Sequence, residues 1–174
     1  MAKAFSDAER DRLRAQLMAE ARALFVSGGL RAVSLSRITR AAGVAKTSFY
    51  AFFPSKEALI LDLLADEAPG VSARVMAPLY DPMLTAPEAL SRFLEALLYE
   101  YATNPFLARL VSDPGAMEAI AARVRPEDLA RKADWMERPL RHFFEARIAA
   151  GELDPLPVGT LIDLVRSVGL LAVH

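Results

Sequence analysis

The chain has 174 residues, of which 53% are hydrophobic and 25% are charged, and its net charge is −1. This length fits one domain or two small ones that share a core, and the composition excludes a disordered or fibrous protein. The absence of cysteine excludes disulfides, thiolate metal sites and cysteine nucleophiles. The charged N-terminus is no secretory signal, and no apolar stretch reaches the ~20 residues of a membrane-spanning helix, so we expect a cytoplasmic protein with no membrane partner.

The near-neutral total charge hides an asymmetry. Residues 1–60 have ten Lys or Arg and five acids, a net charge of +5, whereas the remainder has a net charge of −6. This division indicates that only the N-terminal part meets a polyanion. Solvated charged faces produce the same kind of asymmetry, so the signal is weak by itself.

The first helical signal lies near the N-terminus. Ser6 and Glu9 have the spacing of a capping box. Apolar residues then recur at helical spacing as far as a pair of glycines, which predicts a helix over about 7–27.

Two short helices follow this first one. Ser34 is a candidate N-cap for a helix over about 35–42, and another is expected over 45–53 after a break at Gly43. Short helices joined by a tight glycine-containing turn form a helix-turn-helix, placed here within 34–56.

The rest of the chain is helical by pattern, with prolines and glycines between the helices. Ser55 caps a longer helix, which we expect to be interrupted at Ala68-Pro69-Gly70. The helices expected beyond it are 85–104, 105–112, 117–124, 126–150 and 157 to the chain end. No strand pattern or repeat occurs, so the expected fold class is all-α.

A dense motif lies within the helix-turn-helix and the start of the next helix. Its residues are Ile38, Ala42-Gly43-Val44, Lys46, Tyr50, Phe53-Pro54-Ser55-Lys56-Glu57 and Leu59. This motif resembles the signature stretch of the tetracycline-repressor (TetR) family of transcriptional regulators, and the agreement covers about the first 60 residues. The resemblance implies a three-helix DNA-binding domain over 1–54 and a helical ligand-binding and dimerisation domain over 55–174, linked by the helix from 55.

Three cations occupy the first turns of three successive predicted helices: Arg37, Lys46 and Lys56. Because a helix N-terminus has partial positive charge, a cation there costs ~0.3–1 kcal/mol in the free protein. A phosphate group reverses this cost, since helix N-termini and nearby cations together bind anions. Exposed cations occur at such positions without DNA, but three around a helix-turn-helix favour phosphate binding.

The resemblance also implies specific DNA contacts. Base contacts are expected at Lys46, Thr47 and Phe52, and phosphate contacts at Ser34, Ser48, Tyr50 and Lys56. Lysine donates to guanine acceptors, and the threonine methyl can meet thymine. For Tyr50 the alternative is half-buried packing with its hydroxyl in water. The family pattern more often has glycine or proline at Thr47 and alanine at Thr39, which leaves the operator sequence open.

Four residues in the second part are candidates for contacts with a small-molecule effector: Tyr101, Arg109, Trp135 and His142. Pro139 should free the carbonyl of Trp135 and kink its helix, although a solvated carbonyl among surface residues is an equally good interpretation. Arg109 could pair with an anionic ligand or with an acid such as Asp113.

The last predicted helix is too apolar to face water in a monomer. Its apolar residues are Leu161, Leu164, Val165, Val168 and Leu171. They form either intrachain core or, as the resemblance and the two-fold symmetry of helix-turn-helix proteins favour, the seam of a homodimer. No glycine or polar cap follows the last apolar turn, which suggests that the natural helix pair extends further.

These features predict a ligand-responsive repressor that binds a palindromic operator in double-stranded DNA as a homodimer and is released by a small molecule. No catalytic residue, cofactor or metal site is expected, since the sequence has only His142 and His174 and no nucleophile-elbow, phosphate-loop or zinc signature. The alternatives are a ligand-binding helical protein with a vestigial helix-turn-helix and, less favoured, an enzyme.

Overall fold

The computed structural model describes residues 6–113 and 115–171, without the side chains of 129, 131–133 and 169–171. Within these residues the chain is helical and has no strand, which confirms the all-α prediction. The elements are α1 (Asp7–Ala32), α2 (Leu35–Ala41), α3 (Lys46–Phe49), α4 (Lys56–Met76), the 3-10 helix η1 (Ala77–Tyr80), α5 (Ala86–Thr103), α6 (Pro105–Ser112), α7 (Ala116–Ala121), α8 (Pro126–Ala149) and α9 (Val158–Leu171).

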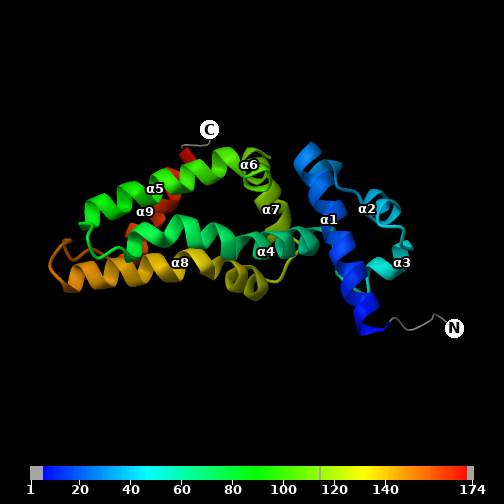
Figure 1. Ribbon diagram of the computed structural model, residues 1–174, viewed down its shortest axis with the longest axis horizontal. Coiled ribbons are helices and arrows are strands. Elements are labelled where there is room, and N and C mark those ends of the chain that lie inside the picture. The colour runs from blue at the N-terminus through cyan, green and yellow to red at the C-terminus, as the bar shows by residue number, and fades with distance from the viewer. Residues whose placement is uncertain (1–5, 114, 172–174) are drawn as a thin grey trace.

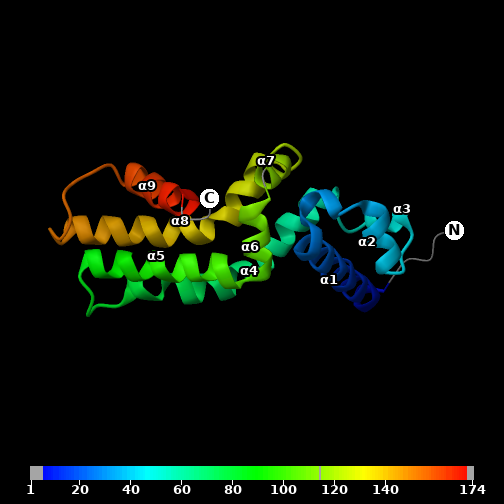
Figure 2. The same ribbon diagram turned by 90° about the horizontal axis from the view of Figure 1, so that it is seen from above.

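The molecule is elongated, with α1, α2 and α3 gathered at one end (Figure 1). Helix α4 runs from this end into a larger body, where it packs against α5 and α8. Helix α9 lies on α8 and α5 at the far side of that body (Figure 2). Helices α6 and α7 stand between the two ends, and α6 packs directly on α1.

Helix α1 begins at the predicted capping box. The Glu9 N–H donates to the Ser6 hydroxyl at 3.3 Å, and the Glu9 carboxylate accepts from the Ser6 N–H at 2.9 Å. The bonds that the Glu9 carboxylate accepts, from the Ser6 N–H above all and from the Ser6 hydroxyl at 3.0 Å, lower the pKa of Glu9. Further along, Leu17, Ala21 and Phe25 are fully buried, so the predicted apolar stripe is the face that α1 turns to the core.

The predicted interruption at Ala68-Pro69-Gly70 is wrong, because α4 continues through Pro69 to Met76. A proline inside a helix costs about 3 kcal/mol. Beyond it, Val71, Val75 and Met76 are all buried, and burial of each such side chain contributes about 1.5–3 kcal/mol. Tertiary packing therefore outweighs the local signal. An ion pair between Arg74 and Glu100 also joins this part of α4 to α5 and lowers the pKa of Glu100.

The end of α1 has a broken helical hydrogen bond. Gly29 has φ 69° and ψ −177°, a conformation outside the helical region. In a regular helix the Leu30 N–H would donate to the Val26 carbonyl. Here the Leu30 N–H donates to Asp113 Oδ2 at 2.6 Å, and the Val26 carbonyl accepts from Arg109 Nε at 3.1 Å.

We call these two hydrogen bonds the α6 clasp. Arg109 lies in the last turn of α6 and Asp113 is its C-cap, so one end of α6 satisfies both halves of the bond that α1 has lost. The clasp joins residues 83 positions apart and fixes α6 against the end of α1.

Replacing Gly29 by alanine tests this junction. A Cβ at Gly29 would lie 2.6 Å from Asp113 Oδ2, and the φ of 69° disfavours any side chain. We expect a loss of stability of more than about 1–3 kcal/mol, the usual cost of such a backbone conformation alone.

The matched control is Gly43→Ala, because Gly43 has a similar φ of 66° but nothing lies within 4 Å of an added Cβ. Thermal unfolding followed by circular dichroism should show the larger decrease for Gly29→Ala. Equal decreases would mean that the close approach of Asp113 is unimportant.

Candidate functional site

The helix-turn-helix is formed by α2, a turn at Gly43 and α3. The Ser34 hydroxyl caps α2 by accepting from the Arg37 N–H at 3.3 Å. Gly43, with φ 66°, provides the turn. Helix α3 is shorter than the predicted 45–53, although the N–H groups of Phe52 and Phe53 still donate to the Phe49 carbonyl at 2.9 and 3.0 Å. The predicted helix is therefore one helical turn followed by tighter turns.

Buried side chains hold α3 in place. Ile38, Phe49 and Phe53 are almost completely buried, and the rings of Phe49 and Phe53 lie 5.6 Å apart. Thr39, which departs from the family pattern, is also buried, and its hydroxyl donates to the Leu35 carbonyl at 2.9 Å. This hydrogen bond satisfies the hydroxyl, so the substitution leaves α2 intact.

The opposite surface of α2 and α3 is polar and open. Lys46 and Thr47, in the first turn of α3, are exposed, as is Arg37, and the Tyr50 side chain is 57% exposed. Ser48 is half-buried. The structure thus brings most of the predicted DNA-contacting residues to one outer end of the molecule, and the exposed side of Tyr50 favours a contact over internal packing.

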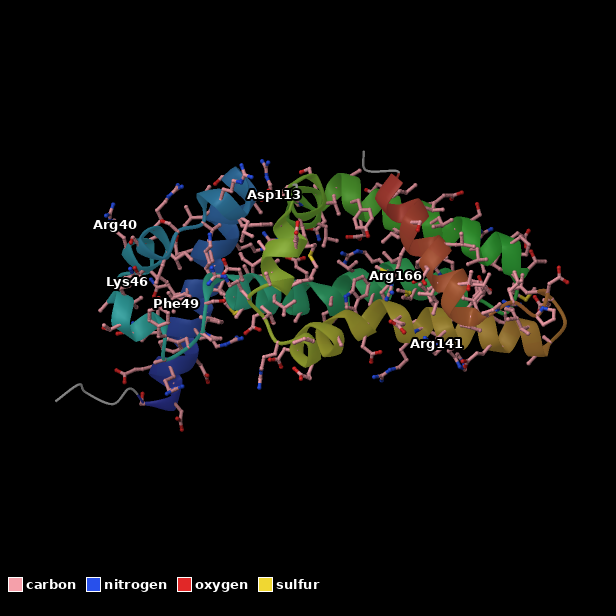
Figure 3. The ribbon with its side chains drawn as sticks, turned by 180° about the vertical axis from the view of Figure 1, so that it is seen from behind. Arg40, Lys46, Phe49, Asp113, Arg141 and Arg166 are labelled. Atoms are coloured by element: carbon pink, nitrogen blue, oxygen red, sulfur yellow. The ribbon has the colours of Figure 1, made fainter. Side chains whose placement is uncertain are left out.

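Arg40 is a further exposed cation that the sequence interpretation missed. It lies in the last turn of α2, and Figure 3 shows it beside Lys46 at the outer end of the molecule. The sequence signal was present, since Arg40 contributes to the basic charge of residues 1–60, but only cations in first turns were considered.

Three predicted contacts, Arg37, Phe52 and Lys56, have intramolecular partners. The Arg37 guanidinium donates to the Ala32 carbonyl at 2.9 Å, with its other N–H groups left for a phosphate. Phe52 is half-buried, and the Arg10 guanidinium lies 5.7 Å from the centre of its ring.

The Lys56 ammonium donates to the carbonyls of Leu30 and Val33 at 3.1 and 2.9 Å. Since an ammonium has three N–H donors, at most one remains for a phosphate. The placement of Lys56 in the first turn of α4 is confirmed, but its contacts there are with the end of α1.

A cavity of about 470 Å³ lies in the larger body, between α4, α5, α6, α7 and α8. Its lining residues are Leu64, Val71, Leu97, Tyr101, Leu107, Leu110, Val111, Asp113, Gly115, Met117, Glu118, Trp135 and Met136. Tyr101 and Trp135 are thus brought together as predicted, and burial raises the pKa of Tyr101.

The other two ligand candidates lie elsewhere. Arg109 belongs to the α6 clasp, and His142 is exposed on α8, away from the lining. The sequence interpretation considered Asp113 only as a partner for Arg109 and did not identify Glu118, because neither residue stands out before α6 packs on α5 and α7 packs on α4 around the cavity.

The predicted dimer residues divide between two faces of α9. Val165 is buried, and Leu161 is half-buried against the core. In contrast, Leu164 is 57% exposed and Val168 is 44% exposed. Leu171 lies in α9, but its side chain is outside the described residues. Arg166 joins α9 to α8 through an ion pair with Glu137 at 2.9 Å, and Figure 3 shows Arg166 in the larger body, between these two helices.

None of the described helices combines the length and apolar character that crossing a bilayer requires. Within the same residues, no three His, Asp or Glu side chains gather as metal ligands would.

Comparisons with known proteins agree with this geometry. Residues 17–63 match the family model of bacterial regulatory proteins of the tetR family. No protein of curated function shows a sequence match to the chain. The matched segment covers α1 from Leu17, both short helices and the beginning of α4, which is the region that carries the helix-turn-helix.

Solved structures share the fold over nearly the whole chain. The fatty acid degradation regulator FadR from Bacillus halodurans is 15% identical, with a TM-score of 0.70 over 98% of this chain and 84% of that one. The regulator FadR from Bacillus subtilis, in complex with stearoyl-CoA, is 18% identical, with a TM-score of 0.68 over 91% and 84%. RolR in complex with resorcinol is 18% identical, with a TM-score of 0.71 over 97% and 80%.

The contacts of Lys56 lead to a prediction that separates stability from DNA binding. In Lys56→Met the carbonyls of Leu30 and Val33 lose their charged donor, and a hydrogen bond to a charged group contributes about 1.5–3 kcal/mol. We expect a clear decrease in the midpoint of thermal unfolding.

Lys46→Met is the control, since Lys46 is an exposed lysine in the equivalent position of α3. It should unfold at the wild-type temperature. Equal midpoints for both variants would contradict the structural role of Lys56.

Proposed function

We propose that the chain is a TetR-family regulator and a ligand-responsive repressor, which the match of residues 17–63 to the tetR-family model and the shared fold support. It binds a palindromic operator as a homodimer and leaves it when a small molecule binds. We place the DNA-binding domain at 1–54 and the ligand-binding and dimerisation domain at 55–174. We further propose that the protein acts in the cytoplasm and is not an enzyme.

The observation that carries the proposal is the surface of α3. Lys46 and Thr47 are exposed in its first turn, while Phe49 on its inner face is fully buried. In helix-turn-helix proteins the N-terminal residues of the second helix contact base edges in the major groove. Arg37, Arg40 and Tyr50 are exposed around α3, where phosphate groups would lie.

The homodimer is supported by the outer face of α9. Leu164 and Val168 are one helical turn apart and both are exposed, although the inner face of the same helix is already packed on α8. A two-fold dimer would cover this apolar face and place two copies of α3 in successive major grooves, ~34 Å apart.

The effector site is supported by the cavity of about 470 Å³. This volume lies within the range of about 300–1,000 Å³ typical of small-molecule sites. Two structures with the same fold are described as complexes with stearoyl-CoA and resorcinol. We propose that an effector binds in this cavity beside Tyr101 and Trp135.

Selection of bound duplexes from a random pool, followed by gel shift, tests DNA recognition. We expect one palindromic sequence to be enriched and its affinity to fall as salt is raised, since phosphate binding releases counterions. Lys46→Ala should lower operator affinity by about tenfold or more, because a good base contact is worth about 1–3 kcal/mol.

Arg138→Ala, which removes an exposed cation from α8, is the control and should bind normally. Enrichment of no sequence would refute the repressor and favour a ligand-binding protein with a vestigial helix-turn-helix.

A charge on the outer face of α9 tests the dimer. Leu164→Glu should convert the dimer to a monomer with an unchanged circular dichroism spectrum, because the Leu164 side chain is already exposed within one chain. Its operator affinity should decrease as well, since a monomer binds only one half-site.

Leu156→Glu is the matched control, because Leu156 is 54% exposed in the loop before α9. Its mass in light scattering should stay that of a dimer. A wild-type monomer, or a dimeric Leu164→Glu protein, would disprove the proposed seam.

A further inference from the structure

We propose that the effector is a compact amphiphilic cation, and that the Asp113 carboxylate binds its charge and so loosens the α6 clasp. The inference rests on the proposed function, because it names the ligand class and the release step of that same effector site.

The described wall of the cavity is apolar with a net negative charge. Most lining residues are aliphatic, methionine or aromatic, and the two acidic residues among them are Asp113 and Glu118. No described lining residue is Lys, Arg or His. Asp113 is half-buried and Glu118 is exposed, so both carboxylates would repel an anionic ligand, and the less screened Asp113 would do so more strongly. A cation with an apolar body can pack against the apolar lining residues and place its charge near the acidic ones.

The aromatic residues of the wall add to this preference. Trp135 and Tyr101 both line the cavity, and the face of an aromatic ring attracts a cation. An acyl-CoA, whose phosphates are anionic, does not fit this wall. The cavity therefore calls for a different class of ligand from the stearoyl-CoA bound by the Bacillus subtilis regulator with the same fold.

Asp113 belongs both to the cavity lining and to the α6 clasp. This residue lines the cavity and also accepts the hydrogen bond from the Leu30 N–H at 2.6 Å. The Leu30 residue is 5% exposed, so few other partners can reach its N–H. The other charged side chain at this junction, Arg109, is hydrogen-bonded to the Val26 carbonyl. A ligand in the cavity can therefore change the hydrogen bond between Asp113 and Leu30.

The release step follows from electrostatics. A hydrogen bond from a backbone N–H to a carboxylate is strong because the acceptor is ionised. A cation in the cavity shares that charge, draws the carboxylate towards itself and weakens the bond to Leu30. The end of α1 then loses its fixed position against α6, and with it α3 loses the position needed for the operator. By reciprocity, operator binding must weaken cation binding by the same factor.

Calorimetry on the full chain tests the ligand class with three probes that have the same alkyl chain. They are octyltrimethylammonium, octanol and octyl sulfate, which are cationic, neutral and anionic. We expect the cation to bind at least about tenfold more tightly than either of the others. Equal or tighter binding of octanol or octyl sulfate, or no binding of the cation, would overturn the inference.

Asp113→Asn tests the release step. The asparagine oxygen can still accept from the Leu30 N–H, but a neutral acceptor makes a weaker bond than a carboxylate. We therefore expect a lower unfolding temperature and a weaker operator affinity than in the wild type, with the operator still bound. The variant should bind octyltrimethylammonium at least about tenfold more weakly, and saturating cation should no longer release the operator. A response like that of the wild type would overturn the role of Asp113.

Two further variants serve as controls. Glu118→Gln removes the other carboxylate of the cavity, so the cation should bind more weakly but still release the operator fully at saturation. Asp163→Asn makes the same chemical change as Asp113→Asn at an exposed position of α9 and should behave as wild type. A loss of release in either variant would contradict the specific role of Asp113.

The outcomes separate this inference from the proposed function. A chain that selects no operator but prefers the cation in calorimetry would disprove the repressor and leave the ligand class standing. A chain that binds its operator but ignores the cation would keep the repressor and disprove the inference.

Discussion

The backbone of Leu30 is the point on which the arrangement of the two ends of the molecule depends. Its N–H donates to Asp113 at the end of α6, and its carbonyl accepts from Lys56 at the start of α4. Buried backbone polar groups must find partners, and at the kink in α1 the helix itself cannot supply them. The ends of α1, α4 and α6 are therefore held together by the requirement to satisfy both backbone groups of one buried residue.

This constraint matters because α3 is too short to position itself. A helix of 4 residues is unstable alone, since nucleation of a helical turn is unfavourable. Its orientation comes from Phe49 and Phe53, whose rings are buried in the core formed with α1 and α4. A change in the angle between α1 and α4 must therefore move Lys46 and Thr47. The Leu30 junction helps to hold that angle, together with the ion pairs of Arg14 with Asp62 and of Arg22 with Glu67.

Local signals in the sequence were enough to predict most of the helices and the two short helices joined by the turn at Gly43. The capping box at Ser6, the cap at Ser34 and the apolar stripes act within a few residues, so they can be identified without a fold. The error at Pro69 has the opposite origin. Its local cost is real, but the buried residues Val71 and Val75 that outweigh it pack against distant helices.

The cavity proposed as the effector site was harder to predict for the same reason. Tyr101 and Trp135 could be named as aromatic candidates, but the role of Arg109 depends on a broken hydrogen bond in α1, 83 residues away. No pattern around Arg109 indicates that Gly29 will release the Val26 carbonyl. Only the folded chain brings a glycine with positive φ, a carbonyl and a guanidinium to one place.

The size of the clasp limits how strongly any effector can act through it. Each of its two hydrogen bonds involves a charged side chain, and such bonds contribute about 1.5–3 kcal/mol. A ligand that weakens only the Asp113 bond can therefore change the free energy of operator binding by a few kcal/mol at most. This range matches the 1–3 kcal/mol typical of coupling between sites, or roughly 5- to 150-fold in affinity. In the proposed mechanism the chain would thus respond to its effector by a graded shift in operator occupancy.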